Sequence, residues 1–340
     1  MRDSVQSISV IVPAYNAEHT IKECVEALLC QSTPPSVCEV IVVDDGSTDD
    51  TGRIAARLGA TVLHQANRGP AAARNLGLKK ARGGVILFTD ADCAPAADWV
   101  QQMIAPLSDP QIAGSKGIYR TRQRSLTARF VQVEYEDRYD YTAQQPFVDL
   151  VDTHAACYRR GALLASGGFD ARFRYCEDQE LSFRMAEAGY KMAFCPRAAV
   201  YHHHPDSWRM YARKKARIGY WKAFVLRLHP GKAQHDSHTP ENVKLQMLLA
   251  ALSAPLAVSA LRSELSACLL AATLIAFLLS AAPFLLKVWR VDRIVALISL
   301  PALYLRAWSL GLGLVAGYLH RLLGRGPLSP RSRTGPGGDV

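Results

Sequence analysis

Short apolar runs alternate with amphipathic stretches through the N-terminal part of the chain. The apolar, β-branched runs predict strands at Ile8–Val12, Val40–Val43, Ala60–His64 and Val85–Phe88. Between them, apolar residues at helical spacing predict helices over Glu18–Cys30, Thr48–Leu58 and Pro70–Ala81, the second capped by Ser47 or Thr48. Strands that alternate with helices are typical of a parallel, doubly wound sheet. The pattern therefore predicts an α/β fold.

The pattern is more mixed after Pro95. It predicts helices at Asp98–Leu107 and Leu126–Tyr141, a strand at Gly114–Tyr119, a buried element at Ala155–Tyr158, a helix from Glu177 to about Gly189, and extended segments at Met192–Cys195 and Ala198–His202. We expect these elements to complete the domain begun by the alternating strands and helices.

The C-terminal third is strongly apolar. Leu245–Leu261 has 17 residues and Leu265–Leu286 has 22 residues without a formal charge. A helix needs about 20 apolar residues to cross a hydrocarbon core of about 30 Å, so the second run is long enough and the first is at the short limit. Ile294–Tyr318 is apolar again, but Pro301 and Arg306 interrupt it.

The distribution of charge along the chain predicts which segments lie in the cytosol. The formal net charge is +10, and Lys and Arg concentrate in Arg209–Lys222, in Lys287–Arg293 and after His320. Such a balance fits nucleic acid or an anionic membrane, and the apolar third favours the membrane. The positive-inside rule places all three segments in the cytosol, which two crossings satisfy, with the third apolar run re-entrant or in the interface. We therefore expect a multi-pass protein of the inner (cytoplasmic) membrane, with its catalytic domain cytosolic.

The eight cysteines form no C-x-x-C pair, which argues against a zinc or thioredoxin-like site and suits a reducing compartment. The N-terminus has no segment typical of a signal peptide. We predict a catalytic domain at 1–205, a basic amphipathic segment at 206–244, membrane helices at 245–320 and a disordered basic tail at 321–340.

The strand Val85–Phe88 is followed by two carboxylates, Asp90 and Asp92, one residue apart. Side chains at i and i+2 of an extended segment point the same way, so the pair could converge on one Mg²⁺ or Mn²⁺ ion. Ligands of open α/β sheets bind beyond the carboxyl ends of the strands. The loops Pro13–Asn16 and Asp44–Ser47 leave strands at that same edge.

Five ordered motifs now carry a resemblance to the family 2 glycosyltransferases of the GT-A fold. They are Val10–Asn16 (VIVPAYN), Val42–Thr51 (VVDDGSTDDT), Gly69–Gly77 (GPAAARNLG), Thr89–Asp92 (TDAD), and Gly168–Asp170 (GFD) with Glu177-Asp178. The resemblance covers about residues 8 to 205. It implies a Rossmann-like, mostly parallel sheet, followed here by transmembrane or interfacial helices. It also implies transfer from a nucleotide-diphosphate sugar to a lipid-linked or cell-envelope acceptor.

The resemblance implies a nucleotide site at the first two loops. The base would lie near Pro13, Ala14 and Tyr15, and Asp45 would accept a hydrogen bond from the base or ribose while Asp44 shapes the loop. Either aspartate could instead cap the following helix.

Further along, Arg74 would face the donor phosphates or form a structural salt bridge, and Asn75 and Gly77 would serve packing.

For the metal, Mn²⁺ or Mg²⁺, the resemblance makes Asp92 a direct ligand. Asp90 would contact the ribose or a metal-bound water. A downstream histidine near the diphosphate is also expected, and His202 and His204 are the candidates, with a solvated polar turn as the alternative. The ion would neutralise the departing diphosphate.

Asp178 is the predicted general base, with Glu177 as the second candidate and helix capping as the alternative role. Inverting transfer needs a carboxylate that takes the proton of the acceptor hydroxyl, and a helix N-terminus stabilises the ionised form. Asp152 and His154 could contribute to donor specificity.

Arg213 and Arg217 lie one helical turn apart in a stretch without acids, and we expect them to meet anionic headgroups, a lipid-diphosphate acceptor, or simply the charged leaflet. The Gln-x-x-Arg-Trp motif of processive polysaccharide synthases is absent, which argues against that alternative. A non-catalytic membrane scaffold with a relic transferase domain is the alternative of another class, and the intact acidic motifs argue against it.

Overall fold

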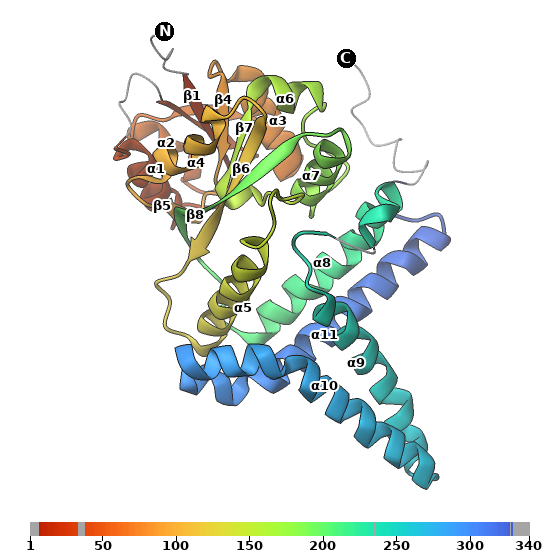
Figure 1. The fold of residues 1–340 in the computed structure, drawn as a ribbon. Coiled ribbons are helices and arrows are strands. Elements are labelled where there is room, and N and C mark those ends of the chain that lie inside the picture. The colour runs from red at the N-terminus through yellow and green to blue at the C-terminus, as the bar shows by residue number, and fades with distance from the viewer. Residues whose placement is uncertain (1–6, 33–37, 234–235, 327, 329–340) are drawn as a thin grey trace. The chain divides into compact units, whose positions relative to one another are not determined.

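The computed structural model describes residues 7–32, 38–233, 236–326 and 328, and the chain divides into two compact units (Figure 1). The first unit consists of Met1–Arg122 and Tyr139–His203, and the second consists of Gln123–Arg138 and His204–Val340. Most of the basic tail predicted from residue 321 lies outside the described residues.

The first unit is built on one mixed sheet whose strand order, in the described part, is β3-β2-β1-β4-β7-β6-β8-β5. Its strands are β1 (Ile8–Ala14), β2 (Cys38–Asp44), β3 (Thr61–His64), β4 (Val85–Phe88), β5 (Cys93–Pro95), β6 (Ile112–Arg120), β7 (Ala156–Arg159) and β8 (Lys191–His202). Its helices are α1 (Ile21–Leu29), α2 (Thr51–Arg57), α3 (Pro70–Lys80), α4 (Trp99–Ile104), α6 (Arg160–Ala165) and α7 (Glu177–Glu187).

The predicted parallel core is confirmed. β1 pairs in parallel with both β2 and β4, and β2 pairs in parallel with β3. Every residue of β4 is buried, as expected for a strand covered on both faces. The carboxyl ends of β1, β2 and β4 therefore meet at one edge, where the loops with the candidate site residues leave the sheet.

Three local predictions were wrong. The helix expected from Thr48 begins only at Thr51, and its N-cap residue is Asp50 rather than Ser47 or Thr48. Thr48 instead donates from its backbone N–H and its hydroxyl to the side-chain oxygen of Asn16, in the loop after β1. The two extended segments predicted around Pro196 form the single strand β8. Its pairing with β6 continues past Pro196 with a shift in register.

The second unit is helical. It contains most of α5 (Leu126–Thr142), together with α8 (Trp208–Leu228), α9 (Glu241–Ala260), α10 (Glu264–Val291) and α11 (Arg293–Leu322). Within the described residues, α9, α10 and α11 are long and apolar enough to cross a membrane. The expectation that Pro301 breaks the third apolar run was wrong, because α11 continues through it. A proline removes only one helix hydrogen bond, and packing of the helix on its neighbours compensates for that loss.

Candidate active site

The loops after β1 and β2 are bound to each other. Asn16 adopts a left-handed backbone conformation with φ of 48°. Its backbone N–H donates to Ser47 Oγ at 3.0 Å, and its side-chain oxygen accepts from the backbone N–H of Thr48 at 2.9 Å. Tyr15 keeps 52% of its surface exposed beside this junction, whereas Ala14 is buried. The loop therefore presents an aromatic ring to solvent on a fixed backbone.

Asp44 and Asp45 are both buried and both organise loops. Asp45 accepts from the backbone N–H of Arg68 at 2.9 Å and from that of Gly69 at 2.8 Å, and Gln65 donates to it at 2.6 Å. Asp44 accepts from the backbone N–H of Ser47 at 2.9 Å. Asp45 thus fixes the segment that opens α3, and a ligand would meet a carboxylate that already holds three donors.

Arg74 is 2% exposed and joins two carboxylates distant in sequence. Its Nη2 lies 2.7 Å from Asp90 Oδ1, and its Nη1 lies 2.5 Å from Glu177 Oε1. Burial lowers the pKa of Arg74, but the charges of Asp90 and Glu177 outweigh it and hold the pKa above the ordinary value. The guanidinium, bound from both sides, ties the loop after β4 to the start of α7.

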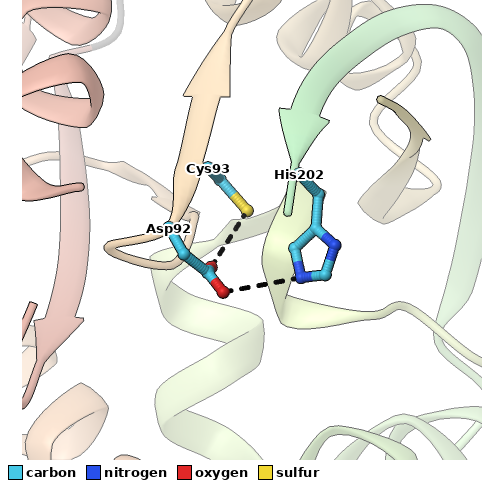
Figure 2. Close-up of side chains that lie close together, drawn as sticks. All are labelled: Asp92, Cys93 and His202. Atoms are coloured by element: carbon cyan, nitrogen blue, oxygen red, sulfur yellow. Dashed lines mark hydrogen bonds and ion pairs between the residues drawn. The ribbon is translucent and has the colours of Figure 1, made fainter. Parts of the chain in front are cut away.

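Asp92, Cys93 and His202 form the group in the described part of the chain that could hold a metal ion (Figure 2). The His202 Nε2 atom lies 3.7 Å from Asp92 Oδ2, and Cys93 Sγ lies 3.6 Å from Asp92 Oδ1. Pairing of β5 with β8 places Cys93 opposite His202, which brings the two segments together across the sequence. The Asp92 side chain is 45% exposed, so the group is open to solvent on the carboxylate side.

The donor set fits a hard divalent ion through Asp92 and His202. Carboxylate oxygens suit Mn²⁺ and a neutral imidazole is a common metal ligand, whereas a thiol binds a metal as the thiolate. Burial, followed by the charges of Asp92 and Asp90, raises the pKa of Cys93 well above its ordinary value. Cys93 is therefore protonated when no ion is bound, and its Sγ atom lies 3.6 Å from Asp92 Oδ1.

His154 and Tyr119 line the interior side of the same group. The rings of His154 and His202 meet edge to face with centroids 4.7 Å apart, and Tyr119 lies 5.0 Å from His154 and 5.8 Å from His202. His154 Nε2 also lies 3.5 Å from Asp90 Oδ2. His154 thus lies between Asp90 and the ring of His202, and its sequence position alone indicated no such contact.

Asp178 lies in the first turn of α7, next to Glu177. Its Oδ1 accepts from the backbone N–H of Gln179 at 2.8 Å. Burial, with the charges of Glu177 and Asp152, raises the pKa of Asp178 to about 7, against the lowering effect of Arg74. A carboxyl group that titrates near neutral pH suits proton transfer.

The buried Lys116 lies 2.7 Å from Asp152, an ion pair that sequence reasoning missed because a lysine within an apolar strand carries no local signal.

The remaining candidates lie in the second unit and are not part of this group. The ring of His204 stacks on Tyr135 with centroids 5.4 Å apart, and its Nε2 lies 3.1 Å from the Gln132 side-chain oxygen. Arg213 and Arg217 are exposed on α8. Of the two predicted histidines, His202 belongs to the same unit as Asp92 and lies next to it, and His204 belongs to the second unit.

Curated proteins similar to this chain are glycosyltransferases. It is 28% identical over 237 residues to the probable glycosyltransferase YdaM of Bacillus subtilis, an alignment that covers 64% of this chain and 56% of that protein. It is also 28% identical over 239 residues to the pre-mycofactocin glycosyltransferase of Mycobacterium tuberculosis, covering 67% and 49%. The chain thus spans about half the length of these relatives.

The fold also has a solved counterpart. The mannosyltransferase PcManGT of Pyrobaculum calidifontis, solved with GDP-Man and Mn²⁺, aligns with a TM-score of 0.59 at 22% identity over 93% of this chain and 87% of that one. Residues 9–164 match the model of the family described as glycosyl transferase family 2. With the ordered motifs and the sheet described above, this match shows that residues 9–164 are similar to glycosyltransferase family 2 and that the first unit has the GT-A fold.

Proposed function

We propose that this protein is an inverting, metal-dependent glycosyltransferase that uses a nucleotide-diphosphate sugar. The observation that carries the proposal is the chain of contacts from Glu177 through Arg74 to Asp90, which ties the start of α7 to the loop that contains Asp92. An acid–base candidate and a metal-binding candidate are thereby held on one rigid scaffold. The family match over residues 9–164 and the open carboxylate of Asp92 support the same reaction.

The donor would occupy the edge formed by the loops after β1, β2 and β4. The exposed ring of Tyr15 offers a stacking surface for the base. Asp92 and His202 would hold the divalent cation, whose charge would neutralise the diphosphate as it leaves. Asp90 is engaged by Arg74, so we assign it to positioning, with the ribose or a metal-bound water as its contact.

The two carboxylate partners of Arg74 support a role in fixing the site. A contact with the donor phosphates would use the same guanidinium that already binds Asp90 and Glu177.

Asp178 would act as the general base. Its carboxylate would take the proton of the acceptor hydroxyl as the acceptor oxygen bonds to the anomeric carbon and the bond to the diphosphate breaks. One displacement of this kind inverts the anomeric configuration. The pKa of about 7 lets Asp178 be ionised for the attack at neutral pH and still be basic enough to accept the proton.

The acceptor is proposed to be a lipid-linked or cell-envelope glycan at the cytosolic face of the cytoplasmic membrane. The apolar helices α9, α10 and α11 support attachment to a membrane, and the concentration of Lys and Arg outside their apolar parts supports the cytosolic orientation. Membrane lipid is then a partner, and the exposed Arg213 and Arg217 are candidates to meet it.

Thermal unfolding of the purified protein with a panel of nucleotide sugars tests the donor site. A ligand that binds only the native state raises the midpoint by mass action, so one or a few donors should do so with Mn²⁺ present and not with a chelator. Asp92→Asn should lose the Mn²⁺-dependent part of the shift, and Asp98→Asn, at an exposed position, should keep it. The donor site would be refuted if no nucleotide sugar shifted the midpoint.

A further inference from the structure

The helices α8 and α11 touch along their backbones. A Cβ atom added to Gly313 would lie 2.0 Å from the Ala216 carbonyl oxygen, and one added to Gly317 would lie 2.4 Å from the Tyr220 carbonyl oxygen. The pairing advances by four residues on both helices, so the two run parallel and side by side (Figure 1). Whatever depth α11 has in a membrane, α8 shares it.

This contact places many charges beside α11. α8 contains the basic residues Arg209, Arg213, Lys214, Lys215, Arg217, Lys222 and Arg227 and no Asp or Glu. Arg or Lys at the centre of a membrane-crossing helix costs about 2.5–3.5 kcal/mol on insertion scales. Several such residues held at hydrocarbon depth would cost on the order of 10 kcal/mol. If α11 crossed the membrane, the basic residues of α8 would therefore lie at hydrocarbon depth, at a high cost in free energy.

The N-terminal half of α11 is bound to charged groups as well. The guanidinium of Arg129, on α5, binds Asp292, the N-cap residue of α11, with Nε 2.8 Å from the carboxylate. Further along, the buried Arg306 lies 3.3 Å from Glu134 on α5. At ~1.5 Å per residue, the length from Asp292 to Gly317 is roughly 37 Å. Charged helices thus accompany α11 over more than the thickness of a hydrocarbon core, about 30 Å.

The contacts of Glu134 bind three helices together at the middle of α11. Its carboxylate lies 2.7 Å from Lys215 Nζ, and the Tyr211 hydroxyl lies 3.1 Å from it. Burial raises the pKa of Glu134, but the charges of Lys215, Arg306 and Arg138 outweigh that effect and lower it to about 2. Glu134 is therefore ionised, and its contacts join α5, α8 and α11 into one charged assembly. No one of these helices can enter the hydrocarbon core without the other two.

The opposite face of α11 is apolar and open. Leu312, Val315, Leu319 and Leu322 are between 52% and 76% exposed and follow helical spacing on one side. On α8, by contrast, Arg209, Arg213 and Arg217 are exposed at successive turns. The paired helices thus expose leucines on α11 and arginines on α8, a combination typical of interfacial helices rather than spanning ones.

We propose that α11 lies in the plane of the membrane surface instead of crossing it. Its leucine face contacts the acyl chains, the arginines of α8 lie at the level of anionic lipid phosphates, and the α9–α10 hairpin is the inserted element. From residue 254 to residue 276 the hairpin has no buried residue, and its only charges there are Arg262 and Glu264 at the tip. This inference rests on the membrane attachment proposed above, and not on the reaction.

Depth measurements by spin labelling test the orientation. One cysteine at a time replaces Leu312, Val315, Leu319 or Leu322 of the full chain, in a background in which Cys30, Cys38, Cys176 and Cys268 are serine. Each variant is labelled with a nitroxide and reconstituted into vesicles of phosphatidylglycerol and phosphatidylcholine. Relative exposure of the label to oxygen and to a water-soluble nickel chelate then reports its depth.

An in-plane α11 predicts the same shallow depth at all four positions. A spanning α11 predicts a steady change of roughly 15 Å over these ten residues at ~1.5 Å per residue, and that result would overturn the proposal. Labels at Leu265, Leu269 and Leu279, exposed along α10, should show such a change and serve as the matched control. If no label entered the bilayer, the proposed attachment to the membrane would be wrong. Sugar transfer in the same vesicles is measured separately, so the proposed reaction is tested independently of the attachment.

Discussion

Replacing Asp178 by asparagine should stabilise the protein at pH 8 while it removes turnover. The folded protein raises the pKa of this carboxyl group from 3.8 to about 7, through burial first and then through the charges of Glu177 and Asp152. Between these two values the folded state keeps a proton that the unfolded chain has released. Stability therefore falls as pH rises from about 4 to about 7, and the neutral asparagine escapes this loss.

The magnitude follows from the same shift. At 1.36 kcal/mol per pH unit, ionising Asp178 in the folded protein costs at most ~4 kcal/mol. Partial exposure to solvent reduces this value, so we expect ~1–3 kcal/mol, or a rise of a few degrees in the unfolding midpoint at pH 8. At pH 5 the folded-state carboxyl group is protonated, and the gain should shrink to less than half.

The assay pairs thermal unfolding in detergent at pH 8 and pH 5 with nucleotide release from the donor at neutral pH. Loss of a general base should lower turnover by about 10²–10⁴-fold, and the wild-type rate should rise with pH through a value near 7. Asp98→Asn, at an exposed position, should change neither quantity. The role of Asp178 as a buried general base is refuted if Asp178→Asn destabilises the protein equally at both pH values, or if this variant turns over like the wild type.

Three further substitutions test other parts of the account. Asp92→Asn should raise the Mn²⁺ concentration needed for half-maximal turnover at least tenfold, whereas Cys93→Ser should not, and equal effects in a Mn²⁺ titration would argue against the assigned ligands. Arg74→Lys should lower the unfolding midpoint and turnover together, because an ammonium cannot bridge two carboxylates as a guanidinium fork does, so an unchanged enzyme would contradict the positioning role. Gly313→Leu should destabilise the helical unit by several kcal/mol through backbone overlap, while Gly311→Ala, with open space around it, should be nearly neutral in the same unfolding assay.

The parallel core could be predicted because its strands are buried on both faces and appear in the sequence as short β-branched runs. β5, only three residues long, carries no such signal, and its existence depends on pairing with β8. The continuity of α11 through Pro301 was equally hidden, since the compensation comes from neighbouring helices. Local patterns thus indicate the elements, and tertiary contacts decide where they begin and end.

The candidate site likewise contains some residues that local sequence patterns indicate and some contacts that they do not. Asp92 and Asp178 could be singled out because carboxylates at a strand end and at a helix start have recognisable local contexts. The partners of Arg74 could not, because Glu177 lies 103 residues away. Nor could the position of His202 beside Asp92, because it depends on the pairing of β8 with β5.

Sugar transfer by this protein should depend on both Asp92 and Asp178. The most direct test is nucleoside diphosphate release from the donor that stabilises the protein, measured with Mn²⁺ in membranes that contain acceptor. We predict release by the wild type that falls at least a hundredfold in both Asp92→Asn and Asp178→Asn while both variants remain folded. Release by either variant at the wild-type rate, or no release by the wild type with any nucleotide sugar, would contradict the account.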